Sequence, residues 1–248
     1  VRPKMIVAGA SSYPRLIDYE SMSRIAKSVG AYLFVDMAHI AGLVAAKLIP
    51  SPIIYADFVS FTTYKTMTGG RGGVILCKKE YADAVDKAVF PGTQGTTAVS
   101  NIAGKATIAK LAKEANFINV QRKTLDSAKL LAAELAEKGY RLVGGGTDTH
   151  QVLVDVTTKW LSGSQAEKTL ESIGIVTNRN YIPKDTGKIA SGLRLGTGPI
   201  SVRGIDKDYV IQIANIIDNA LMARDNQEVL SKLKRNVLDI CKQFPVYR

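Results

Sequence analysis

The sequence contains few of the residues that build disulfide or metal frameworks. Only two cysteines and two histidines occur among its 248 residues. Cys77 and Cys241 lie far apart and match no metal-ligand spacing. We therefore expect reduced structural thiols and no metal site.

Long apolar runs are also missing. No stretch approaches the length that crosses a bilayer, and the basic start Val1-Arg2-Pro3-Lys4 lacks the apolar core and cleavage pattern of a signal peptide. We therefore expect no membrane partner and a cytoplasmic location. Any organellar targeting segment would precede Val1.

Acidic residues are outnumbered by basic ones, 22 to 33, which gives a net charge of +11. The basic residues are scattered, without a tight cluster or a recognised nucleic-acid module, so we expect no nucleic-acid partner. Small molecules with phosphate or carboxylate groups would gain from the positive field.

The remaining composition is that of an ordinary globular protein, with 46% hydrophobic and 22% charged residues and no internal repeat. In the first part, short apolar strands alternate with a helix that Gly30 ends, and this pattern predicts a mixed, mainly parallel α/β sheet. The predicted strands are 5–8, 31–35, 58–62 and 73–77, and the predicted helix is 19–29.

The pattern changes near residue 100 to long helical stretches that continue to about residue 136. Mixed structure then returns, so we predict a large domain with a connecting helix over 1–127 and a small α+β domain over 128–248. The predicted elements of the second part are strands 151–156, 174–177 and 192–196, and helices 164–173, 206–223 and 227–243.

Two polar side chains at strand ends give the strongest functional signal. Asp36 follows one apolar run, and Lys65 lies just beyond the next. Open α/β sheets bind ligands beyond the carboxyl ends of their strands. A carboxylate there would keep the ring nitrogen of pyridoxal phosphate protonated, and a lysine would form the resting Schiff base. Taken singly, each residue has a plainer explanation: Asp36 could be a turn former, and Lys65 could be a solvated surface charge.

Further blocks place this pair in a family context. The sequence resembles the serine hydroxymethyltransferases along essentially its whole length, with the blocks in the family's order. These blocks are 32–46 (YLFVDMAHIAGLVAA), 62–66 (TTYKT), 70–73 (GRGG), 90–95 (FPGTQG), 146–150 (GTDTH), 191–197 (SGLRLGT) and 245–247 (PVY).

The resemblance implies the carboxyl-terminal part of a fold-type I, aspartate aminotransferase-like, pyridoxal-phosphate transferase. In the family, a preceding segment supplies a phosphate cradle, a side chain that stacks on the ring, and substrate-contacting Tyr and Glu residues. We therefore expect a fragment, or one subunit of a split enzyme whose amino-terminal half is a separate chain, and a homodimer or larger oligomer.

Besides Asp36 and Lys65, the resemblance assigns three residues to the cofactor. Ser11 and His39 would lie near the cofactor's phenolic oxygen, and Thr62 would hydrogen-bond near the Schiff base. From the sequence alone, a turn serine, a structural histidine and a strand threonine explain them as well.

Four further residues surround the cofactor by the same resemblance. Arg71 would order the lysine loop, and Tyr64 stands where a histidine usually precedes the lysine. Gly95 and Thr96 belong to a turn whose backbone amides would reach the cofactor phosphate of the other subunit.

Two residues of the second part would bind substrates. Arg194 matches the family arginine that grips the α-carboxylate of the amino acid, which a planar guanidinium does with two parallel hydrogen bonds. Its plainer explanation is a surface salt bridge. Asn180 matches an asparagine near the pterin of the folate, and is otherwise a loop residue.

The implied reaction interconverts serine plus tetrahydrofolate with glycine plus 5,10-methylenetetrahydrofolate. Departures from the family pattern keep two alternatives open: a folate-independent aldolase or transaldolase acting on threonine-like amino acids, and a truncated, non-catalytic partner subunit. The departures are Tyr64, Thr68-Gly69-Gly70, Thr96-Thr97 and Gly198-Pro199.

Overall fold

The computed structural model describes residues 1–96 and 98–247, so Thr97, one of the departures from the family pattern, lies outside them. By their contacts the residues form two compact units. Unit 1 comprises Val1–Ser11 and Ile17–Arg122, and unit 2 comprises Ser12–Leu16 and Lys123–Arg248. The predicted division into folding domains after residue 127 stays a prediction. No helix in the described part of the chain is long and apolar enough to cross a membrane.

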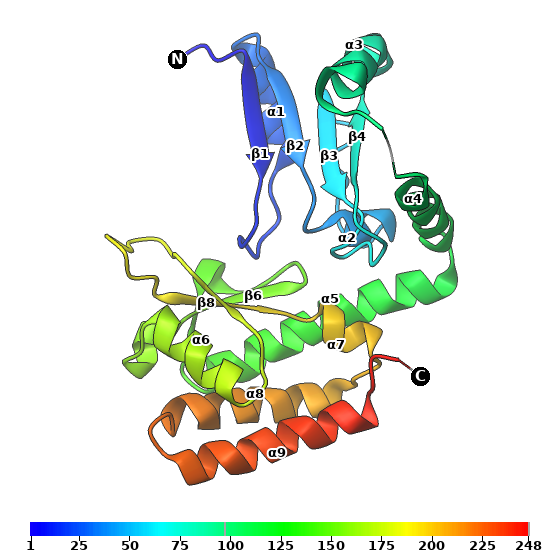
Figure 1. The fold of residues 1–248 in the computed structure, drawn as a ribbon. Coiled ribbons are helices and arrows are strands. Elements are labelled where there is room, and N and C mark those ends of the chain that lie inside the picture. The colour runs from blue at the N-terminus through cyan, green and yellow to red at the C-terminus, as the bar shows by residue number, and fades with distance from the viewer. Residues whose placement is uncertain (97, 248) are drawn as a thin grey trace. The chain divides into compact units, whose positions relative to one another are not determined.

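Unit 1 is built on a four-stranded sheet of order β1-β2-β3-β4 (Figure 1). The first three strands are parallel, and β4 runs antiparallel to β3. The predicted mixed α/β sheet is thus confirmed. The elements of this unit are β1 (Met5–Gly9), α1 (Tyr19–Ser28), β2 (Tyr32–Asp36), α2 (Ala41–Ala45), β3 (Phe58–Thr62), β4 (Gly73–Cys77), η1 (Lys79–Tyr81), α3 (Ala82–Lys87), η2 (Ala88–Thr93), α4 (Val99–Leu111) and the first part of α5 (Ala115–Glu137).

The two faces of this sheet differ. On the inner face, Leu33, Val35 and Val59 are almost completely buried in a core that includes Ala26 of α1. On the outer face, large apolar side chains remain exposed. Parallel sheets are ordinarily covered on both faces, so the exposure of these apolar side chains is unusual for such a sheet. Its exposed members are Met5 (40%), Val7 (66%), Tyr32 (44%) and Ile75 (48%).

Unit 2 contains a second, wholly antiparallel sheet of order β5-β6-β8-β7. The predicted strand 174–177 is wrong. Gly174, with φ +90°, and Ile175 donate their N–H groups to the last turn of α6, so pairing starts only at Asn178. The elements of this unit are the remainder of α5, β5 (Arg141–Leu142), η3 (Val143–Gly145), β6 (Gln151–Asp155), η4 (Val156–Lys159), α6 (Gly163–Ser172), β7 (Asn178–Asn180), β8 (Gly192–Gly196), α7 (Gly198–Val202), α8 (Lys207–Met222) and α9 (Gln227–Gln243).

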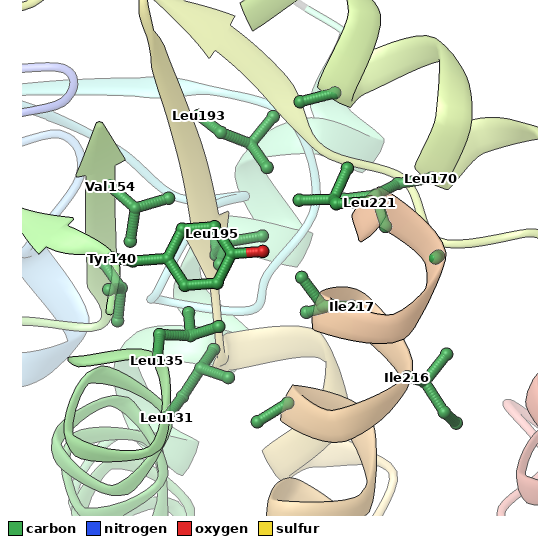
Figure 2. Close-up of a cluster of buried hydrophobic side chains, with 14 of the residues drawn as sticks. Leu131, Leu135, Tyr140, Val154, Leu170, Leu193, Leu195, Ile216, Ile217 and Leu221 are labelled. Atoms are coloured by element: carbon green, nitrogen blue, oxygen red, sulfur yellow. The ribbon is translucent and has the colours of Figure 1, made fainter. Parts of the chain in front are cut away.

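The core of unit 2 joins helices to one face of this sheet (Figure 2). Leu135 of α5, Leu193 of β8 and Leu221 of α8 have no measurable exposure. Tyr140 lies among them, and its burial, with the nearby charge of Asp218, raises its pKa, which keeps the phenol neutral. The other labelled members of this cluster are Leu131, Val154, Leu170, Leu195, Ile216 and Ile217.

One carboxylate fastens three strands of unit 1. Asp57 accepts hydrogen bonds from the Leu33 N–H at 2.8 Å and from the Lys78 ammonium group, while its own backbone pairs with both residues. Burial pushes the pKa of Asp57 up, but the bonds from Lys78 and Leu33 lower it by more, so the pKa lies below its ordinary value.

We expect Asp57→Asn to lower the free energy of unfolding by about 1–3 kcal/mol at neutral pH, because a charged hydrogen bond is lost. Since the folded-state pKa is depressed, this contribution is present above the unfolded pKa and disappears as the pH falls through the folded value. Denaturant unfolding of both proteins from neutral pH down to about pH 2 measures it. Asp239→Asn, at an exposed position, is the control. A difference between Asp57→Asn and wild type that does not shrink in acid contradicts this prediction.

Candidate active site

The carboxyl ends of three parallel strands bring several predicted site residues to one edge of the unit 1 sheet. Gly9 pairs with Asp36, and Asp36 pairs with Ser60. Ser11 lies two residues beyond Gly9, and Thr62 lies two residues beyond Ser60. The register also places the side chains of Asp36 and Thr62 on the outer face of the sheet.

The end of β2 is closely packed against β1. A side chain at Gly9 would place its Cβ 2.5 Å from the carbonyl oxygen of Asp36, so only glycine fits there. The Asp36 side chain is exposed, and its Oδ1 accepts a hydrogen bond from the Ala38 N–H at 2.8 Å. This bond orients the carboxylate and leaves Oδ2 available to a ligand.

Lys65 lies in the loop that joins β3 to β4. The Thr63 N–H donates to the Gly72 carbonyl at 3.0 Å, and the Gly69 N–H donates to the Thr63 carbonyl at 2.7 Å, which closes the base of the loop. Lys65 is half-buried, and within residues 1–96 and 98–247 its ammonium group has no hydrogen bond or ion pair. The backbone of the loop is therefore fixed, while the Lys65 amine has no partner among the described residues.

A buried set of hydrogen bonds, here called the Thr66 bridge, ties this lysine loop to the segment after Asp36. The Thr66 hydroxyl accepts from the Gly42 N–H at 3.0 Å and donates to the His39 carbonyl at 2.9 Å. The Gln121 amide of α5 donates to the Thr66 carbonyl at 2.7 Å. A Cβ at Gly42 would lie 2.2 Å from that carbonyl oxygen, so the backbones of α2 and the lysine loop are in close contact.

The Thr66 bridge was not predicted from the sequence. Thr66 and Gly42 belong to blocks that resemble the family, but nothing local marks their contact. Gln121 lies 55 positions from Thr66, and no local pattern distinguishes it from other polar helix residues.

The remaining residues of this edge fit a cofactor that offers hydrogen-bond acceptors and an aldehyde. The Thr62 hydroxyl is buried, and it has no hydrogen-bond partner among the described residues. Ser11 is exposed and His39 is half-buried. An unsatisfied buried hydroxyl is costly, so a hydrogen bond between Thr62 and a bound group would be favourable.

Arg71 and Tyr64 interact with each other. The Arg71 guanidinium carbon lies 4.7 Å from the centre of the Tyr64 ring, within range of a cation–π interaction. Gly95 and Thr96 lie in an exposed loop between η2 and α4. In the described part of the chain, no hydrogen bond links these two residues to the strand ends.

Unit 2 places the predicted substrate residues on one strand pair. Arg194 of β8 lies opposite Asn178 of β7, and its Nη2 donates to the Asn178 side-chain oxygen at 3.0 Å. Burial lowers the pKa of Arg194, although the guanidinium remains a cation at neutral pH. Asn180 faces the same side, and its buried Oδ1 has no hydrogen-bond partner among the described residues.

Comparison with known proteins agrees with these observations. A family model described as serine hydroxymethyltransferase matches residues 1–217, a range that includes every candidate site residue. The family predicted from the sequence blocks is therefore confirmed. The chain, with its lysine loop fixed beside Asp36 and its half-buried Arg194, belongs to the serine hydroxymethyltransferase family.

Proposed function

We propose that this chain provides the cofactor- and amino-acid-binding residues of a fold-type I serine hydroxymethyltransferase. The reaction would interconvert serine plus tetrahydrofolate with glycine plus 5,10-methylenetetrahydrofolate. The observation that supports this most directly is Lys65. Its amine has no internal partner among the described residues, and the Thr66 bridge ties its loop to the segment that follows Asp36.

When bound, pyridoxal phosphate supplies an aldehyde that condenses with amines and a pyridinium ring that withdraws electrons from the bond being broken. Lys65 would provide the amine. Asp36 Oδ2 would hold the proton on the ring nitrogen. Thr62, with its unsatisfied hydroxyl, would donate a hydrogen bond near the lysine, and Ser11 and His39 would contact the phenolic oxygen.

Arg194 would bind the α-carboxylate of serine or glycine. Its side chain is already partly desolvated and oriented by Asn178, so less side-chain entropy is lost when an anion binds. The unsatisfied Oδ1 of Asn180, on the same side of the sheet, would accept a hydrogen bond from the pterin of the folate.

By the family resemblance, the proposed site would also use groups from a further segment. The apolar outer face of the unit 1 sheet, on which Met5 and Val7 are exposed, supports a further polypeptide that covers it, since parallel sheets are covered on both sides. We propose that an amino-terminal segment, in the same or a separate chain, supplies the phosphate cradle and the principal general acid and base. The exposed Gly95 and Thr96 would reach the other subunit of a homodimer.

One alternative is a folate-independent aldolase acting on threonine-like amino acids. The observation that favours it is Tyr64, whose ring is engaged by Arg71 where the family usually has a histidine. A non-catalytic partner subunit is less well supported, because Asp36, Lys65 and Arg194 are all retained.

Lys65→Ala is expected to abolish covalent attachment of the cofactor. Wild-type protein incubated with pyridoxal phosphate and then borohydride should retain the cofactor on the peptide that contains Lys65, as measured by mass spectrometry. Lys110→Ala, at an exposed position on α4, should label as wild type does. Labelling that persists in Lys65→Ala, or that spreads evenly over surface lysines, would refute the assignment.

Arg194→Lys is expected to weaken binding of serine and glycine about 10- to 150-fold, because a charge-assisted hydrogen bond contributes about 1.5–3 kcal/mol. Titration of the cofactor-loaded protein, followed by absorbance, measures the half-saturating concentration. Arg179→Lys, on the neighbouring strand and paired with Glu167, is the matched control. Equal affinities in Arg194→Lys and wild type would rule out the carboxylate role.

Folate dependence separates the two catalytic alternatives. For a hydroxymethyltransferase, we expect serine cleavage by the assembled protein to rise at least tenfold when tetrahydrofolate is added, since the folate accepts the one-carbon unit; this factor of about ten corresponds to 1.4 kcal/mol in the barrier. Threonine cleavage, which releases a larger aldehyde, provides the internal comparison. Serine cleavage that is unchanged by folate, together with faster threonine cleavage, would favour the aldolase.

A further inference from the structure

The segment Ser12–Leu16, here called the strap, belongs by its contacts to unit 2, although the chain on both sides of it belongs to unit 1. Its anchor is Asp148, whose Oδ2 accepts from Arg15 Nε at 2.7 Å and from the Leu16 N–H at 3.3 Å. The Asp148 N–H in turn donates to the Pro14 carbonyl at 3.0 Å. One residue thus binds three consecutive positions of the strap.

The loop that precedes Asp148 is shaped around Arg15. Arg15 Nη1 donates to the Gly144 carbonyl at 3.2 Å. A Cβ at Gly144, where φ is +77°, would lie 3.1 Å from Arg15 Cγ, and one at Gly146, where φ is +151°, would lie 3.2 Å from Arg15 Nη1. Glycine at both positions lets the guanidinium pass along the loop backbone.

The other side of this loop is fixed to the start of β6 and to the residue that follows β8. The Thr147 hydroxyl donates to the Gln151 carbonyl at 2.6 Å, and the Thr197 N–H donates to the His150 carbonyl at 3.0 Å. Thr197 is completely buried, and its hydroxyl also donates to the Thr124 carbonyl at 2.7 Å. Thr197 lies three positions after Arg194, so the segment Thr147–His150 lies between the strap and the strand of Arg194.

The block 146–150 resembles the family, yet the proposed function assigns it no ligand. Arg15 and Asp148 have side-chain exposures of 37% and 33%, so solvent screens their charge attraction. The strap is therefore connected to β8 by backbone hydrogen bonds and not by the ion pair alone. On one side the Asp148 N–H donates to the Pro14 carbonyl, and on the other the Thr197 N–H donates to the His150 carbonyl. Ser12, the first residue of the strap, is bonded directly to Ser11.

We propose that Asp148 is a positioning residue, which couples the backbone at Ser11, through the strap, to the β8 strand that presents Arg194. The inference rests on the proposed function for the roles of Ser11 and Arg194. Asp148 touches neither cofactor nor substrate in this scheme. Amino-acid affinity therefore depends on it only through the residues that it holds.

The first test is amide hydrogen exchange on the full chain carrying Asp148→Asn. Exchange at Leu16 and at Thr197 should both rise, by roughly 3- to 30-fold relative to Val152 in β6, the range expected for such coupling. Asp155→Asn is the matched control, because it removes another Arg–Asp pair of unit 2, that of Arg141. This control should not raise exchange at Leu16 relative to Val152.

The pattern of exchange decides between coupling and a local turn. A rise at Leu16 with no change at Thr197 would overturn the proposal, because Asp148 would then hold only its own turn. The double variant Arg15→Gln/Asp148→Asn should exchange no faster at Thr197 than Asp148→Asn alone, since both changes break one link. The proposal would also be overturned if exchange at Thr197 in the double variant rose by the product of the two single-variant increases.

The second test measures function in the cofactor-loaded protein. Asp148→Asn should raise the half-saturating glycine concentration by roughly 3- to 30-fold and leave borohydride labelling at Lys65 unchanged. Unchanged glycine affinity would overturn the positioning role. If wild-type protein labels no lysine, the proposed function fails, whereas the exchange pattern still decides whether the strap and β8 are coupled.

Discussion

The geometry of the unit 1 site depends on the Thr66 bridge. Strand pairing alone fixes Asp36 and Thr62, because both lie at the ends of paired strands. It does not fix Lys65, which lies three residues beyond β3 in a loop. Two hydrogen bonds of the Thr66 hydroxyl join that loop to the segment after Asp36, and one from Gln121 joins it to α5. The bonds from Gly42 and Gln121 are buried, and an unsatisfied buried polar group costs about 1–3 kcal/mol, so the arrangement tolerates little displacement.

Glycine allows the close backbone approach that these hydrogen bonds need. Gly42 lies against the Thr66 carbonyl, and Gly9 lies against the Asp36 carbonyl. In each case a Cβ would collide with a backbone oxygen, which cannot move without breaking a hydrogen bond or a strand pair. The same principle operates in unit 2, where Gly192 packs against the Asn180 carbonyl. The backbone around Asp36, the lysine loop and Asn180 is therefore fixed by close contacts that only glycine permits.

The elements that were predicted correctly from the sequence are those that local residue patterns specify. Strands 58–62 and 73–77 and helix 227–243 match the structure at both ends, since the strands are short apolar runs and the helix has regularly spaced apolar residues. The prediction of a strand at 174–177 was wrong. The apolar residues after Gly174 resemble a strand in sequence, but the N–H groups of Gly174 and Ile175 bind carbonyls at the end of α6. The contacts of Gln121 with Thr66 and of Asp148 with Arg15 were not predicted, because both join distant positions through ordinary polar residues. Motif resemblance located Asp36, Lys65 and Arg194, but the way each is held appears only in three dimensions.

The charge distribution explains how the Lys65 amine can remain without an acidic partner among the described residues of a strongly basic chain. Several of its carboxylates bind internal donors: Asp57 binds Lys78 and the Leu33 N–H, and Asp155 binds Arg141 and Thr157. These bonds depress the carboxyl pKa values, although burial alone would raise them, so the acids remain charged at neutral pH. With 33 basic and only 22 acidic residues, cations outnumber the carboxylates that could neutralise them. Lys65 pairs with no acid among the described residues, and the Nη2 of Arg194 binds a neutral amide oxygen. The Lys65 amine thus keeps capacity for the aldehyde that the proposed cofactor would bring.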